Sequence, residues 1–234
     1  MEIIKKIENK LVFKAEIDET LANAIRRYVH QVPVIAVDSV EITKNDSPLY
    51  DETVAHRIGL IPIKQSKKEG NLKLKSNKEG FVYSGEMEGD VKVVYDKIPL
   101  TLLSKGQEIE LTATTKAGKG SDHSKFLPGL LTYRNVVEIT LDKNVAEKVK
   151  QISQDVEIKI KGNKAVIIDD KEREINDVCD GLSEKEGGEI EVKPTKELIV
   201  SIESFGQMDS KDIFIKAIEV LKKDLEEISK KLNK

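Results

Sequence analysis

The sequence predicts an α+β protein in which a helix near each end of the chain accompanies a middle rich in strands. Two observations support this prediction. Apolar and polar residues alternate over several short segments, which is the pattern of a half-buried strand. Near both ends the apolar residues recur instead at spacings of three and four, the pattern of an amphipathic helix. The predicted order is strand–helix–strand, a β-rich block, a small α/β block, and a strand followed by a long helix.

The N-terminal part begins with a strand over 11–17 and continues into a helix. Asp18 and Thr20 can cap this helix with side-chain oxygens. Pro33 ends it, because proline cannot donate a backbone hydrogen bond and disfavours helix at the residue before it. A β-branched stretch over 34–43 predicts a strand, and 45–48 a turn. The apolar face of the helix comprises Leu21, Ala24, Ile25, Tyr28, Val29 and Val32.

For the middle of the chain the sequence predicts mainly strands and turns. A short helix capped by Asp51, with Gly59 as its C′ residue, precedes an extended segment over 60–63. Residues 64–80 are rich in Lys, Gly, Ser and Asn, which predicts a mobile loop or a hairpin. The remaining predictions are strands over 81–115 with turns at 85–88 and 104–106, a loop over 116–129 and a strand over 130–141.

Near Asp142 the predicted structure changes from strands to short helices and strands. We expect a lysine-rich helix over 143–153, strands over 156–160 and 165–169, a helix near 174–182 and strand structure over 189–203. The second of these helices ends either at Gly181 or at Gly187–Gly188. A long helix capped by Asp209 or Ser210 then ends the sequence. An apolar stripe of this length must find a partner surface, which is the first helix, another subunit, or both. The stripe comprises Phe214, Ala217, Ile218, Leu221, Leu225, Ile228 and Leu232.

Composition excludes several classes of protein. The 234 residues correspond to one large domain or two to three small ones. The net charge of −3 is too small an excess to suggest a generic nucleic-acid binder. No apolar run approaches the roughly 18 residues that cross a bilayer, and no signal peptide is visible, so we expect a cytoplasmic protein. The single cysteine, Cys179, cannot form an intrachain disulfide or supply a multi-cysteine metal site.

A search for catalytic motifs identifies no enzyme class. The segment 118–120 lacks the third glycine of a dinucleotide-binding fingerprint. The run Ser121-Asp122-His123 is not a triad, because adjacent side chains project in different directions. His30, His56 and His123 are far apart in sequence and show no H-x-x-x-H spacing, so the sequence does not point to a metal site. Acidic neighbours at 177, 180 and 184 would raise the pKa of Cys179, so we expect an inert thiol.

One ordered set of motifs is specific. Its segments are Thr20–Arg27 (TLANAIRR), Val32–Pro33, Ala36–Ile42 (AVDSVEI), Asn45–Glu52 (NDSPLYDE), Ala55–Ile63 (AHRIGLIPI), Lys105–Leu111, Gly118–His123, Pro128–Gly129 and Ile202–Gly206. In this order the segments resemble the alpha-like subunits of DNA-directed RNA polymerase, the family of the archaeal D subunits and of the third-largest eukaryotic core subunit. The resemblance covers nearly the whole chain, which makes it far stronger than any single motif.

The resemblance implies a domain organisation. Residues 1–45 and 193–234 would form one discontinuous dimerisation domain of the alpha-like type. Residues 46–142 would form a β-rich insert domain, and 143–192 a small ferredoxin-like domain. This organisation explains why two amphipathic helices lie at opposite ends of the chain.

The resemblance also implies partners. The chain would form a heterodimer with the smaller alpha-like L subunit of RNA polymerase. The heterodimer would then carry the small N and P subunits and the second-largest catalytic subunit, and would meet DNA only through the complex. No membrane partner and no catalytic residues are implied. The residues that we expect at partner interfaces are Asn23, Arg26 and Arg27 on the first helix, and Phe214, Ile218, Leu221, Leu225 and Ile228 on the last.

The sequence departs from part of this family. Some members hold iron–sulfur clusters on runs of cysteines in the ferredoxin-like domain. Here only Cys179 stands in that region, with Leu182 and Lys185 three and six positions further on. The region of the eukaryotic zinc loop, 65–85, has no cysteine either. We therefore expect no cluster, no zinc and no other cofactor, and a domain 143–192 held together by packing alone.

Two other functions remain open at this stage. A stand-alone enzyme would place its active site around Gly118–His123. A direct DNA-binding module would use the lysine-rich segments, although acidic residues are interleaved with them and aromatic residues make up only 4% of the chain.

Overall fold

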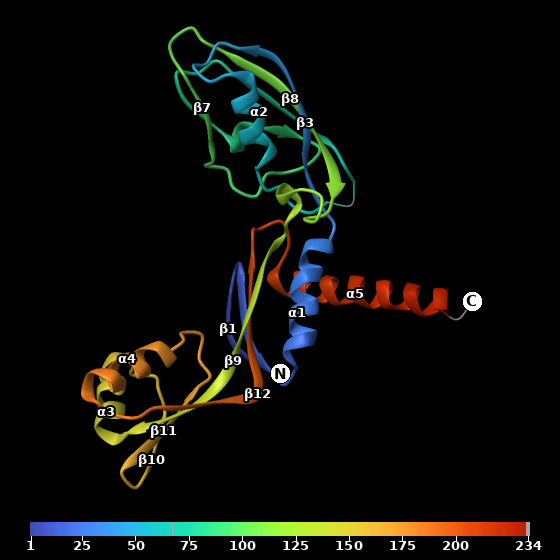
Figure 1. The fold of residues 1–234 in the computed structure, drawn as a ribbon. Helices are drawn as coiled ribbons and strands as arrows, with labels where there is room; N and C mark the ends of the chain where they lie inside the picture. The colour runs from blue at the N-terminus through green and yellow to red at the C-terminus, as the bar shows by residue number, and fades with distance from the viewer. Residues whose placement is uncertain (67, 233–234) are drawn as a thin grey trace. The chain divides into compact units, whose positions relative to one another are not determined.

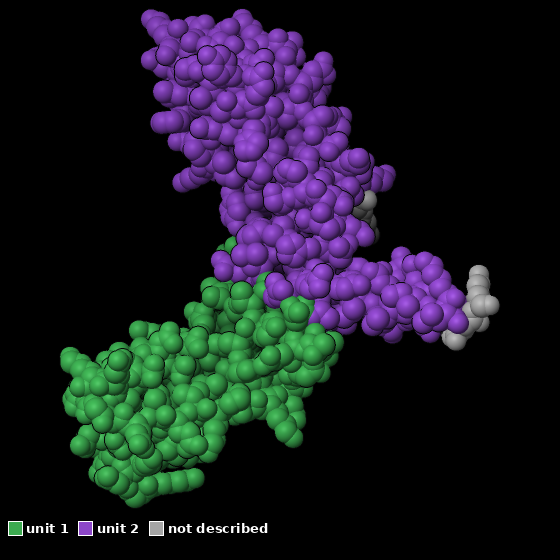
Figure 2. Space-filling view, viewed as in Figure 1, with its two compact units in different colours: residues 1–23, 131–202 green, residues 24–130, 203–234 purple. Residues whose placement is uncertain are grey.

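The computed structural model describes residues 1–66 and 68–232. The chain divides into two compact units, coloured separately in Figure 2. Unit 1 comprises residues 1–23 and 131–202, and unit 2 comprises residues 24–130 and 203–234. Strands and helices are mixed, and the strand pairs include many antiparallel ones, as an α+β class requires. The finer description by a β-rich insert and a ferredoxin-like domain remains a prediction.

Unit 1 is built on a six-stranded sheet (Figure 1). The outermost strand, β1, has a sequence of alternating Ile and Lys pairs that is mostly exposed, and sequence reasoning did not predict it. Its antiparallel pairing with β2 buries Val12 and Phe13 on the inner strand. In sheet order the strands are β1 (Glu2–Ile7), β2 (Lys10–Ala15), β12 (Glu191–Ser204), β9 (Gly129–Asp142), β11 (Lys164–Asp169) and β10 (Ile158–Lys161).

Two helices pack beside the β9–β11 end of this sheet, α3 (Lys143–Ile152) and α4 (Asn176–Glu186). Gly162 closes the tight β10–β11 turn with φ +65°, and Gly187 ends α4 in the left-handed conformation. All four elements between 143 and 190 were predicted to within a few residues. The buried core that they share comprises Ile139, Leu141, Val145, Ala146, Val149, Val156, Ala165, Ile167, Ile175 and Cys179.

Unit 2 contains a second core formed by strands and one short helix. Leu72 and Leu74 of β4 alternate with exposed residues and point into this core, to which Val54 and Ile58 of α2 also belong. The four-stranded sheet has the order β3 (Val34–Asn45), β8 (Ile109–Gly118), β4 (Asn71–Ser76) and β6 (Glu88–Gly89). A ribbon of β5 (Gly80–Tyr83) and β7 (Pro99–Leu103), helix α2 (Asp51–Gly59), and the 3-10 turns η2 (Ser84–Glu86) and η3 (Ser124–Phe126) complete this part.

Several local predictions need correction. The first helix, α1 (Glu19–Tyr28), ends earlier than predicted and continues as a 3-10 turn, η1 (Val29–Gln31). Tyr50 occupies the N-cap position of α2, and Gly59 is its last helical residue rather than its C′ residue, since Leu60 closes the helix with φ −95°. The region 64–80 contains strand β4, because the alternation of its two leucines outweighs the turn-like composition.

The domain boundaries inferred from the resemblance remain a prediction. Strand β3, placed in the dimerisation domain by that division, pairs along its length with β8 inside unit 2. The last helix, α5 (Ser210–Leu232), also lies in unit 2. Among the described residues, no helix is both long enough and apolar enough to cross a membrane.

Candidate partner interface

Helix α5 changes from buried to exposed along its length. It begins where the amide of Ile213 donates to the carbonyl of Asp209, 3.0 Å away, which confirms the predicted start. Ile213 and Ala217 are fully buried in unit 2, and Phe214 is half-buried. Beyond this point the apolar side chains become exposed. The exposed fractions are 39% for Ile218, 57% for Leu225, 54% for Ile228 and 81% for Leu232.

The exposed apolar residues share one face of α5. Ile218, Leu221, Leu225 and Ile228 follow one another at spacings of three and four, with Leu221 half-buried among them. The first three border a shallow hollow of about 370 Å³ together with Lys222, Glu226 and Ser229. Isolated exposed leucines are ordinary, but a continuous apolar row on a helix points to a surface that another element covers. We call the four apolar residues the α5 face.

Helix α5 is fixed to the end of α1. Turn η1 packs against α5 within unit 2. The hydroxyl of Tyr28 donates to Oδ2 of Asp224 at 3.1 Å. Burial and this bond to a carboxylate together raise the pKa of Tyr28 above its ordinary value, so the donor stays protonated at neutral pH. These contacts hold the exposed half of α5 in a defined direction relative to the end of α1.

The three predicted interface residues of α1 lie within one turn of the helix. Ala22 and Ile25 are buried, whereas Arg26 and Arg27 are exposed and Asn23 is half-buried. Asp18 confirms the predicted cap, because its Oδ1 accepts the amide of Leu21 at 2.9 Å. The two arginines occupy the last turn, where the helix dipole favours positive charge. Partner contacts of these residues remain a prediction.

The motif that suggested a stand-alone enzyme has a local structural role. Nδ1 of His123 accepts the amide of Lys125 at 3.1 Å and thereby caps turn η3. The amide of Ser121 donates to the carbonyl of His30. Lys125 lies 5.0 Å from the ring centroid of Phe126 and 3.3 Å from Asp38. These groups hold the loop after β8, and their polar atoms are directed into local contacts.

The described residues contain no group of three or more His, Cys, Asp and Glu side chains that could hold a metal ion. The expectation that the protein binds no cluster and no zinc rests on its cysteine count and remains a prediction.

The sequence matches the RNA polymerase Rpb3/Rpb11 dimerisation domain over residues 12–225. The chain belongs to this family. The match confirms the resemblance drawn from the motifs in 20–63 and 105–129, and it includes the N-terminal helix and the α5 face except for Ile228.

Relatives of the Rpb3/Rpb11 family in archaea cover almost the whole chain. DNA-directed RNA polymerase subunit Rpo3 of Pyrococcus horikoshii is 31% identical, and the alignment covers 94% of this chain and 93% of the relative. Subunit Rpo3 of Methanosphaera stadtmanae is 30% identical over 97% of this chain and 96% of the relative. That of Pyrococcus furiosus is 28% identical over the full chain and 97% of the relative.

A glycine in one of the family-like motifs is explained by a close approach. Gly206 follows β12 and has φ +95°, a conformation that side chains disfavour. A Cβ atom at this position would lie 2.5 Å from Cγ1 of Val94 and 3.0 Å from the hydroxyl oxygen of Tyr95. The segment 202–206 therefore needs glycine at its end to pass this part of unit 2 before α5 begins.

This member of the Rpb3/Rpb11 family holds its 143–192 segment with a buried ion pair as well as with packing. Nη2 of Arg134 on β9 lies 2.9 Å from Oδ1 of Asp169 at the end of β11, and the aspartate side chain is only 1% exposed. Oδ2 of the same carboxylate accepts the amide of Ile175 at 3.1 Å. Arg134 also donates to the carbonyl of Lys171 at 2.6 Å. The expectation of packing alone was therefore wrong, because this carboxylate fixes both ends of the loop before α4.

Lysines of the first hairpin hold the same loop from outside. Nζ of Lys14 lies 3.3 Å from Asp170, and Lys5 and Lys10 lie 2.7 and 3.1 Å from Glu172. The bonds from Lys5 and Lys10 lower the pKa of Glu172 below its ordinary value. The sequence offered no signal for this arrangement, because the partners are more than 150 residues apart and many other lysines and carboxylates were available.

Cys179 is a residue of α4 and is buried in the core of unit 1, as an inert thiol should be. Burial and then the charge of Asp169 raise the pKa of the thiol from 9.0 to about 11. The direction agrees with the sequence-based expectation, but its causes are burial and Asp169 rather than the acidic neighbours on the same helix.

We therefore predict that Cys179 resists alkylation in the folded protein. At pH 8.5 the higher pKa lowers the thiolate fraction about a hundredfold relative to an ordinary cysteine, and burial blocks access as well. Iodoacetamide should modify native protein at least about a hundred times more slowly than protein in guanidinium chloride, as followed by mass spectrometry. The raised pKa also predicts that stability is unaffected below pH 9 and falls as the pH rises from 9 towards 11. Equal rates in both states would contradict this prediction.

Proposed function

We propose that this chain is a non-catalytic, assembly-platform subunit of archaeal DNA-directed RNA polymerase. In this proposal it forms a heterodimer with the small alpha-like L subunit, and the heterodimer nucleates assembly of the transcribing enzyme. Membership of the Rpb3/Rpb11 dimerisation family supports a role in subunit pairing. The archaeal relatives, which are named as polymerase subunits, support the larger complex.

The observation that carries the proposal is the α5 face. Covering an aliphatic side chain contributes roughly 1.5–3 kcal/mol when the whole side chain leaves water. Ile218, Leu225 and Ile228 are each 39–57% exposed, so a partner helix can remove much of this surface from water. Three or four such residues supply enough binding free energy for a stable pair, since about 1.4 kcal/mol corresponds to a factor of ten in affinity.

The remaining surfaces are assigned to further partners. We propose that Asn23, Arg26 and Arg27 donate hydrogen bonds to large-subunit surfaces, because arginine can bind carboxylates through two parallel bonds. The insert domain 46–142 and the domain 143–192 then provide surfaces for the N and P subunits and for the second-largest catalytic subunit. DNA is met only through the assembled enzyme, in the cytoplasm, and this chain itself supplies neither cofactor nor catalytic group.

A tagged chain expressed in its own host tests this function. Affinity purification followed by native mass spectrometry should give a one-to-one complex with the L subunit, and the full set of polymerase subunits at low salt. Hydrogen exchange of the amides over 218–232 should be slower in the one-to-one complex than in the isolated chain. A monomer that copurifies with no polymerase subunit would refute the proposal.

A further inference from the structure

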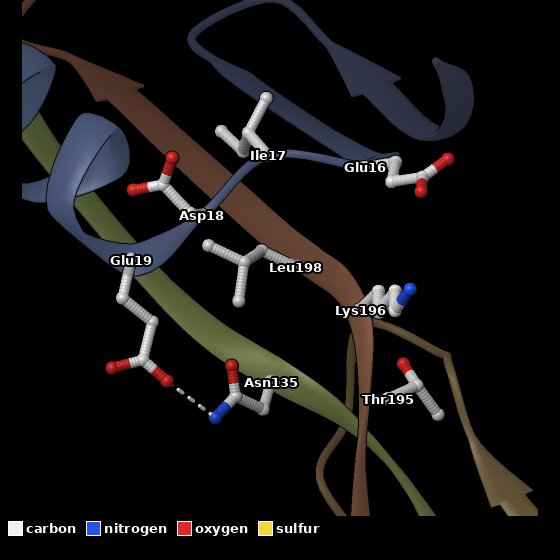
Figure 3. Close-up of a pocket in the computed structure, with 8 residues that line it drawn as sticks. All are labelled: Glu16, Ile17, Asp18, Glu19, Asn135, Thr195, Lys196 and Leu198. Atoms are coloured by element: carbon white, nitrogen blue, oxygen red, sulfur yellow. Dashed lines mark hydrogen bonds between the residues drawn. The ribbon is translucent and has the colours of Figure 1, made fainter.

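Unit 1 contains a pocket of about 400 Å³, whereas the α5 face belongs to unit 2. Figure 3 shows the side chains around the pocket, which come from the β2–α1 connection, from the first residue of α1, from β9 and from β12. No step of the proposed pairing with the L subunit uses this pocket. Its lining residues are Glu16, Ile17, Asp18, Glu19, Asn135, Thr195, Lys196 and Leu198.

The pocket combines an apolar floor with an acidic rim. Leu198 is buried and Ile17 half-buried, so both present aliphatic carbon to the hollow. In Figure 3, Leu198 lies between the carboxylates of Glu16 and Glu19. A side chain that lies across this pocket therefore has hydrocarbon beneath it and negative charge at two sides.

The acidic groups exceed the local positive charge. Three carboxylates and the single ammonium of Lys196 leave a net charge of −2 around the pocket. Asp18 is occupied as the cap of α1, and Oε1 of Glu19 accepts Nδ2 of Asn135 at 2.8 Å, which fixes its direction. Within the described part of the chain, the Glu16 carboxylate forms no ion pair or hydrogen bond.

The pocket also lies at the beginning of the helix that carries predicted interface residues. Glu19 precedes Asn23 by four residues on α1, so the two share one face of the helix. A partner segment that follows this face of α1 reaches the rim of the pocket.

We propose that this pocket receives a lysine or arginine side chain from another subunit of the complex. The aliphatic stem of that side chain packs on Ile17 and Leu198, and its charged end pairs with the carboxylate of Glu16, while Glu19 adds negative charge at the other side of the pocket. The inference rests on the proposed function, because it takes the occupant from a polymerase subunit. It adds a second anchoring point, chemically different from the apolar α5 face.

Photo-crosslinking in the intact complex tests this inference. p-Benzoylphenylalanine is incorporated at position 17 in one tagged chain and at position 228 in another, and the crosslinked peptides are sequenced by mass spectrometry. The probe at 17 should join a segment of a polymerase subunit at or within two residues of a lysine or arginine. The probe at 228 should join the L subunit.

Charge reversal provides the matched control. Glu16→Lys should lower the crosslink yield from position 17 at least about fivefold by repelling the cation. Glu157→Lys, at an exposed carboxylate elsewhere in unit 1, should leave the yield unchanged. Asp18 is left unchanged in these variants because it caps α1, so its replacement would disturb the helix as well as the pocket.

Each result decides one question. A crosslink from 228 together with none from 17, or one from 17 to a segment without a basic residue, overturns the pocket inference and leaves the proposed function standing. An unchanged yield in Glu16→Lys overturns it as well. No crosslink from either position, with no polymerase subunit copurified, refutes the proposed function and this inference with it.

Discussion

Replacing Arg134 by methionine should lower the free energy of unfolding of unit 1 by about 3 kcal/mol. The variant leaves the carboxylate of Asp169, 1% exposed, without its ion-pair partner. Removing one member of a buried pair costs several kcal/mol because the remaining charge stays out of water. The carbonyl of Lys171 also loses its donor, so the loop before α4 loses its attachment to β9.

Urea unfolding measures the loss of stability, and hydrogen exchange shows in which part of the chain it occurs. Exchange should accelerate over 164–179, where β11 and α4 depend on the ion pair, and remain unchanged in the β3–β8 sheet of unit 2. Lys148→Met is the matched control, because its partner Glu186 is 38% exposed and such pairs contribute less than about 1 kcal/mol. Arg134→Lys keeps the charge but not the forked geometry, and should fall between the two. A loss no larger than that of Lys148→Met would contradict the assigned role.

The sequence predicts elements well where the apolar pattern is long and regular. Helix α5 was predicted to within a few residues because its apolar residues repeat one spacing over many positions, and strand β3 because its sequence is a continuous β-branched stretch. Strand β1 was missed because an edge strand buries little and its Lys and Glu residues hide the alternation. Strand β4 was missed because only two leucines mark it within a lysine-rich segment.

Of the features that bear on function, the sequence alone predicts some and not others. The α5 face follows from spacing along one helix, which a sequence displays directly. The Arg134–Asp169 pair depends on how β9 pairs with β11, where Asp169 lies opposite Val137. The pocket beside α1 depends on three segments from distant parts of the sequence. Such convergence has no local signature, so neither feature could be found before the fold was known.

The double variant Leu221→Asp with Leu225→Asp should abolish pairing with the L subunit. In the isolated chain Leu225 is 57% exposed and Leu221 half-buried, so the fold of unit 2 should tolerate both changes. In a complex both positions would lie at the centre of the covered face. Each aspartate then removes apolar contact and places an unpaired charge in the interface, which costs several kcal/mol. A combined loss above about 5 kcal/mol raises the dissociation constant more than about a thousandfold.

The control places the same charges on the other side of α5. Lys223→Asp with Glu227→Asp puts two aspartates at the same four-residue spacing and changes the net charge by the same −2, but on the polar face. On gel filtration this control should elute with the L subunit, whereas the Leu221/Leu225 variant should elute as a folded monomer with an unchanged circular dichroism spectrum. A one-to-one complex with that variant would show that pairing does not depend on the α5 face. Loss of pairing in both variants would point instead to the overall charge of the helix, so only the difference between them supports burial of the apolar row.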